Sequence, residues 1–184
     1  MTGPAISEIR VAADPAAWAR AGFSVAGESI HVGGVSIEFV EGEGGIVDWT
    51  LADFERDLPA ATHANGVTAI DHVVLLAPDL EQKIAQLEAQ GIELRRIREG
   101  ETGMGAYRQA FFRVGRPILE VVEADPPERF WGITFATADI DAAAELLGDK
   151  LGRVKDAVQP GRRIATVRNE ASLGLPVALI SAER

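Results

Sequence analysis

The chain has 184 residues, a net charge of −10 and no cysteine, with 47% hydrophobic and 25% charged residues. This is the composition of a globular protein; its acidity argues against nucleic-acid binding, and the lack of cysteine excludes disulfides, thiolate metal sites and a cysteine nucleophile. The apolar runs fall short of the roughly 20 residues that span a bilayer, and the first ten residues lack the segments of a secretory signal, so we expect a cytoplasmic protein with no membrane partner.

The first 66 residues predict an incomplete structural unit. The stretch "ISEIRVAADPAAWARAGF" is typical of a strand followed by a short helix. Residues 28–41, "ESIHVGGVSIEFVE", then align without a gap on residues 110–123, "AFFRVGRPILEVVE". One more strand is expected around residues 46–51, followed by a polar connection. Residues 1–66 therefore read as a degenerate copy, short of one strand, of the unit that follows.

Residues 67–126 predict a complete β-α-β-β-β unit. The run "IDHVVLLA" is a short apolar strand rich in valine. Asp79 is a suitable N-cap for a helix that Gly91 would end. The helix has one apolar face, formed by Leu80, Ile84 and Leu87. Three strand-like runs separated by glycine-rich turns complete the unit.

Residues 127–184 repeat this order of elements. "FWGITFATA" predicts a strand and "DIDAAAELLGDKLG" a helix, with Ile140, Ala144 and Leu147 on its apolar face. Within the strands that follow, "RIATVR" aligns with "RQAFFR" of the preceding unit. The sequence thus predicts an α+β fold made of two full units, 67–126 and 127–184, and one degenerate unit, 1–66.

Two tandem units, the first opening with "IDHVVLLAPDLE" and closing with "ILEVVE", resemble the vicinal oxygen chelate superfamily of glyoxalases, bleomycin-resistance proteins and extradiol dioxygenases. The resemblance extends from Val67 to Ser181 and is weaker in the N-terminal third. It implies that the two units pair, so that their sheets form a curved, cup-like half-barrel around one site. It also implies that the first and last strand of each unit supply ligands to a divalent metal.

Carried over residue by residue, the resemblance gives His72 and Glu120 as metal ligands, with Glu120 also as the catalytic carboxylate. An imidazole and a carboxylate suit Fe, Mn, Ni, Zn or Co, and open coordination positions would let a substrate chelate the ion. His72 would point into the cup. Its neighbour Asp71 would face the other way, because side chains alternate along a strand.

The third unit departs from the family pattern. Gly132 or Trp131 stands where His72 would be expected, and Ala178 where Glu120 would be. Two ligands are fewer than the three or more of most catalytic metal sites. The sequence leaves several other residues that could complete the site: Glu38, Gln109, Glu123 and His31.

Further residues are candidates for binding a ligand in the cup. Arg108, Gln109 and Arg163 would orient an anionic or polar substrate. Trp131 and Phe135 would line the pocket with aromatic surface.

Two basic clusters and His63 give weaker indications of function. The basic clusters 94–99, "LRRIRE", and 160–168, "PGRRIATVR", fit either solvated strand edges or an anion-binding wall. His63 lies in the polar connection and is expected at the surface.

Two functions remain open on this sequence. One is a metal-dependent lyase, isomerase or dioxygenase acting on a small molecule with adjacent oxygens. The other is a metal-free binding or resistance protein that sequesters a small compound, and the acidic surface would suit a cationic one. A homodimer is expected in either case, because a partial third unit leaves sheet edges to cover.

Overall fold

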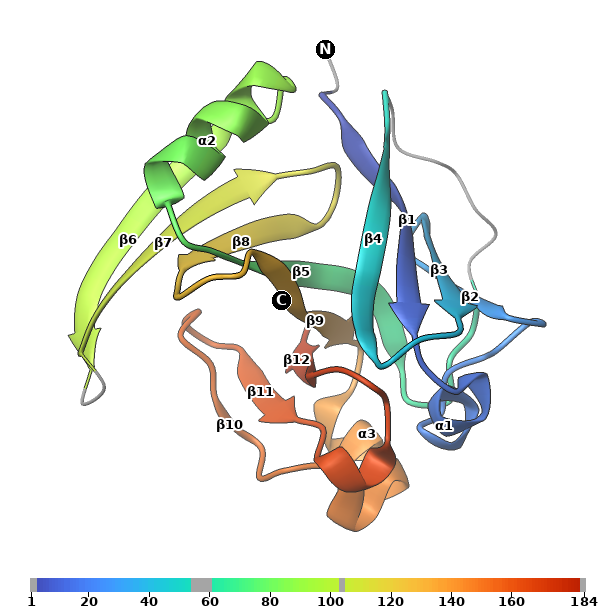
Figure 1. Cartoon of the computed structure of the whole chain (residues 1–184). Helices are drawn as coiled ribbons and strands as arrows, with labels where there is room; N and C mark the ends of the chain where they lie inside the picture. The colour runs from blue at the N-terminus through green and yellow to red at the C-terminus, as the bar shows by residue number, and fades with distance from the viewer. Residues whose placement is uncertain (1–2, 54–60, 103–104, 183–184) are drawn as a thin grey trace.

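The computed structural model describes residues 3–53, 61–102 and 105–182. Its strands form two separate sheets, one of four strands and one of eight, and the few helices lie outside them (Figure 1). The predicted α+β class with curved sheets is confirmed.

The second unit has the predicted order of elements. It consists of β5 (Val67–Ala77), α2 (Leu80–Ala89), β6 (Leu94–Thr102), β7 (Gly105–Arg113) and β8 (Ile118–Glu123). β6, β7 and β8 form an antiparallel meander, and β8 returns to run parallel to β5. In Figure 1 the long β6–β7 hairpin curves away from the body of the molecule, with α2 packed over it.

The helices follow the local sequence signals. The Asp79 side chain caps α2 by accepting a hydrogen bond of 2.9 Å from the backbone N–H of Gln82, and Gly91 follows the helix with a φ of +79°. The buried face of α2 consists of Leu80, Ile84 and Leu87, as predicted. The corresponding helix of the third unit buries Ile140, Ala143 and Leu147, so that Ala143 takes the place expected for Ala144.

The third unit repeats the same order in a smaller form. It consists of β9 (Arg129–Thr137), α3 (Ile140–Leu147), β10 (Lys155–Asp156), β11 (Arg163–Thr166) and β12 (Val177–Ser181). Two short 3₁₀ helices, Gly148–Lys150 and Asn169–Ala171, lie within its connections. β12 runs parallel to β9, as β8 does to β5.

The two full units pair through their first strands. β5 and β9 are antiparallel neighbours at the centre of the large sheet, whose order is β10-β11-β12-β9-β5-β8-β7-β6. The two units therefore pair within one chain.

The N-terminal part of the chain contains the four strands of the small sheet and one helix. It consists of β1 (Ala5–Ala12), α1 (Pro15–Arg20), β2 (Ser29–Val32), β3 (Val35–Val40) and β4 (Gly45–Ala52). β1 lies parallel to β3 and β2 pairs with β3, which reproduces β5, β8 and β7 without a counterpart of β6 in residues 3–53. β4 runs antiparallel beside β1, in the position that β9 occupies beside β5.

The small sheet packs on the face of the large sheet that lies away from the cup. Trp18 of α1 contacts Phe135 of β9 with ring centroids 5.9 Å apart, and Trp49 of β4 contacts Phe130 at 5.1 Å. The buried Trp18 indole N–H also donates to the carbonyl of Leu173 at 3.1 Å. These contacts join the N-terminal unit to the other two in one continuous core. No helix in the described part of the chain is long and apolar enough to cross a membrane.

Candidate functional site

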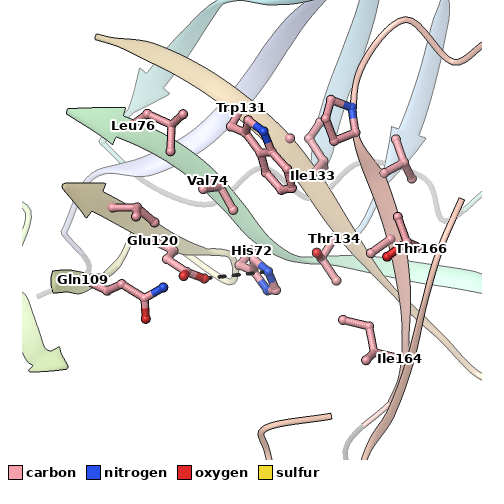
Figure 2. Close-up of a pocket in the computed structure, with 15 residues that line it drawn as sticks. His72, Val74, Leu76, Gln109, Glu120, Trp131, Ile133, Thr134, Ile164 and Thr166 are labelled. Atoms are coloured by element: carbon pink, nitrogen blue, oxygen red, sulfur yellow. Dashed lines mark ion pairs between the residues drawn. The ribbon is translucent and has the colours of Figure 1, made fainter. Parts of the chain in front are cut away.

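A cavity of about 430 Å³ lies in the cup formed by the large sheet, a volume within the range of small-molecule sites (Figure 2). Both units contribute to it. Its apolar lining consists of Val74, Leu76, Val122, Trp131, Ile133, Ile164, Pro176, Val177 and Ala178. Its polar side chains are those of His72, Gln109, Glu120, Thr134 and Thr166.

His72 and Glu120 face each other on the wall of this cavity (Figure 2). His72 projects from β5 and Glu120 from the adjacent β8, where its register partner is Val74. The His72 Nε2 and Glu120 Oε2 atoms are 3.9 Å apart, and the two side chains are only 16% and 17% exposed. The structure thus brings together the two residues that the resemblance gives as metal ligands.

Asp71 lies beside His72, so the expectation that it faces the other way was wrong. The register of β5 against β9 passes from Ile70–Phe135 to His72–Thr134, which leaves Asp71 as an extra residue in β5. Such a β-bulge interrupts the alternation of side chains. As a result Asp71 Oδ2 is 2.8 Å from His72 Nδ1.

Arg162 anchors Asp71 from the third unit. Its Nη1 is 2.6 Å from Asp71 Oδ1, and its Nε donates to the backbone carbonyl of Ser181 at 2.7 Å. Burial acts to raise the pKa of Asp71, but hydrogen bonds from His72 and Arg162 and their positive charges outweigh it and hold this pKa below its ordinary value. Asp71 is therefore an ionised acceptor. In the neutral form of His72 the ring proton lies on Nδ1, toward Asp71, and Nε2 faces Glu120 in the cavity.

The pKa of Glu120 shifts in the opposite direction. Burial of the carboxyl group raises its pKa, and the nearby charges of His72, Arg98 and Arg96 offset this only in part. A carboxyl group with a raised pKa next to a fixed imidazole is an arrangement suited to acid–base chemistry.

The backbone of the third unit explains why no ligand comes from its first strand. Gly132 occupies the position equivalent to His72, and a Cβ on Gly132 would lie 2.5 Å from the carbonyl oxygen of Pro176. Any side chain at this position would require the backbone to move. At the position equivalent to Glu120, Ala178 pairs with Thr134 as Glu120 pairs with Val74.

Of the residues predicted to bind a ligand, Gln109 and Trp131 line the cavity and the other three do not. Phe135 is fully buried on the opposite face of the sheet against Trp18, because a second bulge at Trp131 shifts the alternation of β9. Arg108 alternates with Gln109 and lies on the helix side.

On the helix side of the sheet, Arg108 forms ion pairs with Glu81 at 2.6 Å, Glu99 at 2.9 Å and Glu123 at 3.6 Å. Arg163 forms an exposed ion pair with Asp141 at 2.7 Å. Phe135, Arg108 and Arg163 thus have side chains of a type suited to a binding site, but these side chains do not face the cavity.

The alternative third ligands, apart from Gln109, lie outside the cavity. Glu38 and His31 belong to the small sheet, where Glu38 accepts a hydrogen bond from the Ser36 hydroxyl. His63 was expected at the surface but is only 4% exposed. Its Nδ1 accepts from the backbone N–H of Ser24 at 3.0 Å, and burial lowers its pKa.

Sequence reasoning missed Asp71 and Arg162 as residues of the site. The only signal for Arg162 was the basic run 160–168, and it did not show which of its two adjacent arginines turns inward. In the structure Arg162 is 7% exposed, whereas Arg163 is exposed.

Comparison with solved structures identifies the fold. The methylmalonyl-CoA epimerase from Mycobacterium tuberculosis superposes with a TM-score of 0.53 and 16% identity, over 70% of this chain and 95% of that one. A Streptomyces coelicolor methylmalonyl-CoA epimerase variant in complex with 2-nitronate-propionyl-CoA gives a TM-score of 0.50 and 24% identity, over 64% and 99%. No protein-family model matches the chain, and no match was found among curated proteins.

At these identities the likeness concerns the fold alone. It agrees with the topology, in which two β-α-β-β-β units pair through their first strands around one concave site. The chain therefore has the fold of the vicinal oxygen chelate superfamily, the glyoxalase and bleomycin-resistance group.

Proposed function

We propose that this protein binds a small molecule in the cup and catalyses a proton transfer on it, as an isomerase or lyase does, with His72 and Glu120 as the acid–base pair. The observation that carries this proposal is the chain of contacts from Arg162 through Asp71 to His72, which ends 3.9 Å from Glu120. A site that only bound an apolar ligand away from water would not need this chain of polar contacts.

The two groups have complementary roles. Asp71 fixes the tautomer of the neutral imidazole, and in this form His72 Nε2 is free to take a proton from the substrate. Glu120, whose pKa is raised, holds a proton at higher pH than an ordinary glutamate and donates it to the substrate. One proton leaves the substrate and one returns, and water resets the pair after each turnover.

A metal-dependent version, including dioxygenase chemistry, requires a complete ligand set for Fe, Mn, Ni, Zn or Co. His72 Nε2 and Glu120 Oε2 are close to the separation that two bonds of roughly 2.0–2.2 Å to one ion allow. Within the described residues, however, no group of three histidine, cysteine, aspartate or glutamate side chains could hold a metal. Of the alternative third ligands, Gln109 lines the cavity, where its side-chain amide oxygen would be the donor. The protein side chains therefore fall short of a full metal site.

A hydrogen-exchange assay tests the proposed chemistry. The protein is incubated in D₂O with a panel of small carbon acids, namely ketones, thioesters and β-keto acids, and loss of the α-proton signal is followed by NMR. We expect exchange of at least one compound, and a loss of roughly 10²-fold or more in His72→Ala and Glu120→Gln, the usual contribution of a general acid or base. Glu88→Gln, an exposed change of the same type on α2, should leave the rate unchanged.

Metal analysis of the purified protein and of His72→Ala accompanies this assay. An ion that is retained by the wild type, lost in His72→Ala and needed for exchange would replace the metal-free mechanism with the metal-dependent one. Exchange that persists after chelation supports the mechanism proposed here.

The second candidate function is metal-free sequestration of a small compound. It is favoured by the predominantly apolar lining of the cavity and by Trp131, which is 51% exposed although it borders the cavity. A compound that binds in the cup but shows no exchange with any member of the panel would favour this function. In that case His72→Ala should weaken binding only by the roughly 0.5–1.5 kcal/mol of an ordinary hydrogen bond.

A further inference from the structure

A second hollow lies on the same face of the large sheet, beyond Glu120 toward β6. Its volume is about 270 Å³, and it is lined by Arg95, Arg96, Phe111, Phe112, Arg113 and Ile118. Three of these six residues are arginines, in a chain whose net charge is −10. Two of them, Arg95 and Arg96, belong to the basic run 94–99, which has no role in the proposed proton transfer.

Strand register places this hollow next to the cavity of His72. Phe111 of β7 pairs directly with Glu120 of β8, and Ile118 of β8 pairs with His72 of β5. Residues directly opposite one another on neighbouring strands share a face of the sheet. The surface from His72 to Phe111 is therefore continuous across β5, β8 and β7.

Arg96 and Arg98 extend this surface onto β6. Arg96 pairs with Phe111 and Arg98 with Gln109, which itself lines the His72 cavity. Both guanidinium groups lie over the Phe111 ring, at 4.6 Å and 5.5 Å from its centroid. The ring thus holds two positive charges on the concave side of the sheet.

These two guanidinium groups differ from those of Arg95 and Arg108. Arg95 pairs with Glu93 at 3.1 Å, and Arg108 on the helix side has three carboxylate partners. Among the residues that the structure describes, neither Arg96 nor Arg98 forms an ion pair with a carboxylate. Their charges act on Glu120, which lies on the same face of the sheet. Guanidinium groups that are oriented by stacking and form no ion pair match the planar oxygens of a carboxylate or phosphate.

We infer that Arg96 and Arg98 bind the anionic group of a ligand, a carboxylate or a phosphate, whose flat or apolar part lies over Phe111 and whose reacting end reaches His72 and Glu120. This inference rests on the proposed function for the position of the reacting end, and it names an organic anion as the substrate class. It reverses the expectation that the acidic surface selects a cationic compound, because the local charge on this wall of the cup is positive.

Three probes with the same aromatic body test the inference: 1-naphthyl phosphate, 1-naphthoate and neutral 1-naphthol, titrated by fluorescence. We expect the wild type to bind at least one anion about tenfold more tightly than naphthol, the effect of roughly one charge-assisted hydrogen bond. R96Q/R98Q should bind all three probes equally. The two anionic probes tell apart a site for phosphate from one for carboxylate.

The control variant R153Q/R168Q removes the same charge from exposed positions of the third unit. It should keep the preference for anions. Because Arg96 is exposed and Arg98 is not fully buried, R96Q/R98Q should fold, and a thermal melt within a few degrees of wild type checks this.

The inference is overturned if R96Q/R98Q keeps the preference, if both double variants lose it equally, or if the wild type shows none. The result is independent of the exchange assay. A preference for anions that depends on Arg96 and Arg98, without any proton exchange, supports the anion site and refutes the proton-transfer function. Exchange that is restricted to neutral compounds, without a preference for anions, supports proton transfer and refutes the anion site.

Discussion

Arg162 and Asp71, from different units of the fold, form a buried ion pair at 2.6 Å that fixes the orientation of His72. The pair crosses the seam between the second and third units. It therefore links the stability of their pairing to the geometry of the candidate acid–base site.

Replacing Asp71 with asparagine should destabilise the protein by about 3 kcal/mol at pH 7, because the charge of Arg162 stays buried without this carboxylate. The stability that Asp71 contributes is present above its ordinary pKa of 3.8 and is lost as the pH falls through its lower pKa in the folded state. Urea unfolding at pH 7 and at pH 3 should show the difference shrinking in acid. Asp141→Asn, which removes the exposed partner of Arg163, is the matched control and should change little. Equal effects of the two substitutions would contradict the role of Asp71.

Replacing Glu120 with glutamine should stabilise the protein at pH 8. Because burial raises the pKa of Glu120, ionising it costs stability: this cost is absent below its ordinary pKa of 4.5 and grows as the pH rises through its pKa in the folded state. Glutamine carries no charge at any pH. Thermal melts should therefore give Glu120→Gln a higher Tm than wild type at pH 8 and a similar Tm at pH 4. A lower Tm at pH 8 would mean that the ionised carboxylate is stabilised in the folded protein.

Replacing Gly132 with alanine should cost roughly 1–3 kcal/mol, the usual penalty of overpacking. The new Cβ would lie 2.5 Å from the backbone oxygen of Pro176, which cannot move as a flexible side chain could. Gly3→Ala, whose Cβ would meet its nearest atom at 3.5 Å, is the control. Chemical denaturation measures both. If Gly132→Ala is neutral, the backbone at this position is not what excludes a ligand side chain from the third unit.

The protein should form a homodimer. Within the described chain the edges of the two sheets are β2 and β4 in one and β10 and β6 in the other, and edge strands favour association. Light scattering coupled to gel filtration measures the mass directly. A monomer at micromolar concentration would contradict this prediction. It would show that the edge strands, including β4, which pairs with β1, need no partner chain.

The elements themselves could be predicted because their signals are local. The Asp79 cap, the apolar face of α2 and the glycine that ends it are encoded within a few residues, and the same pattern recurs in α3. His72 and Glu120 came from the resemblance to the vicinal oxygen chelate superfamily, carried over onto the first and last strands of the second unit. The boundaries 1–66, 67–126 and 127–184 remain our division of the chain.

The faces of the strands were decided only by the tertiary structure. Counting by twos along β9 puts Trp131 and Phe135 on one side, but the bulge at Trp131 sends Phe135 into the core against Trp18. The bulge at Asp71 likewise brings this carboxylate to His72. A bulge is set by how a strand pairs with a neighbour that is distant in the sequence, and by the extra residue that this register leaves over. The sequence by itself therefore determined that His72 and Glu120 lie in strands, while the pairing of β5 with β8 and β9 decided which residues meet in the cup.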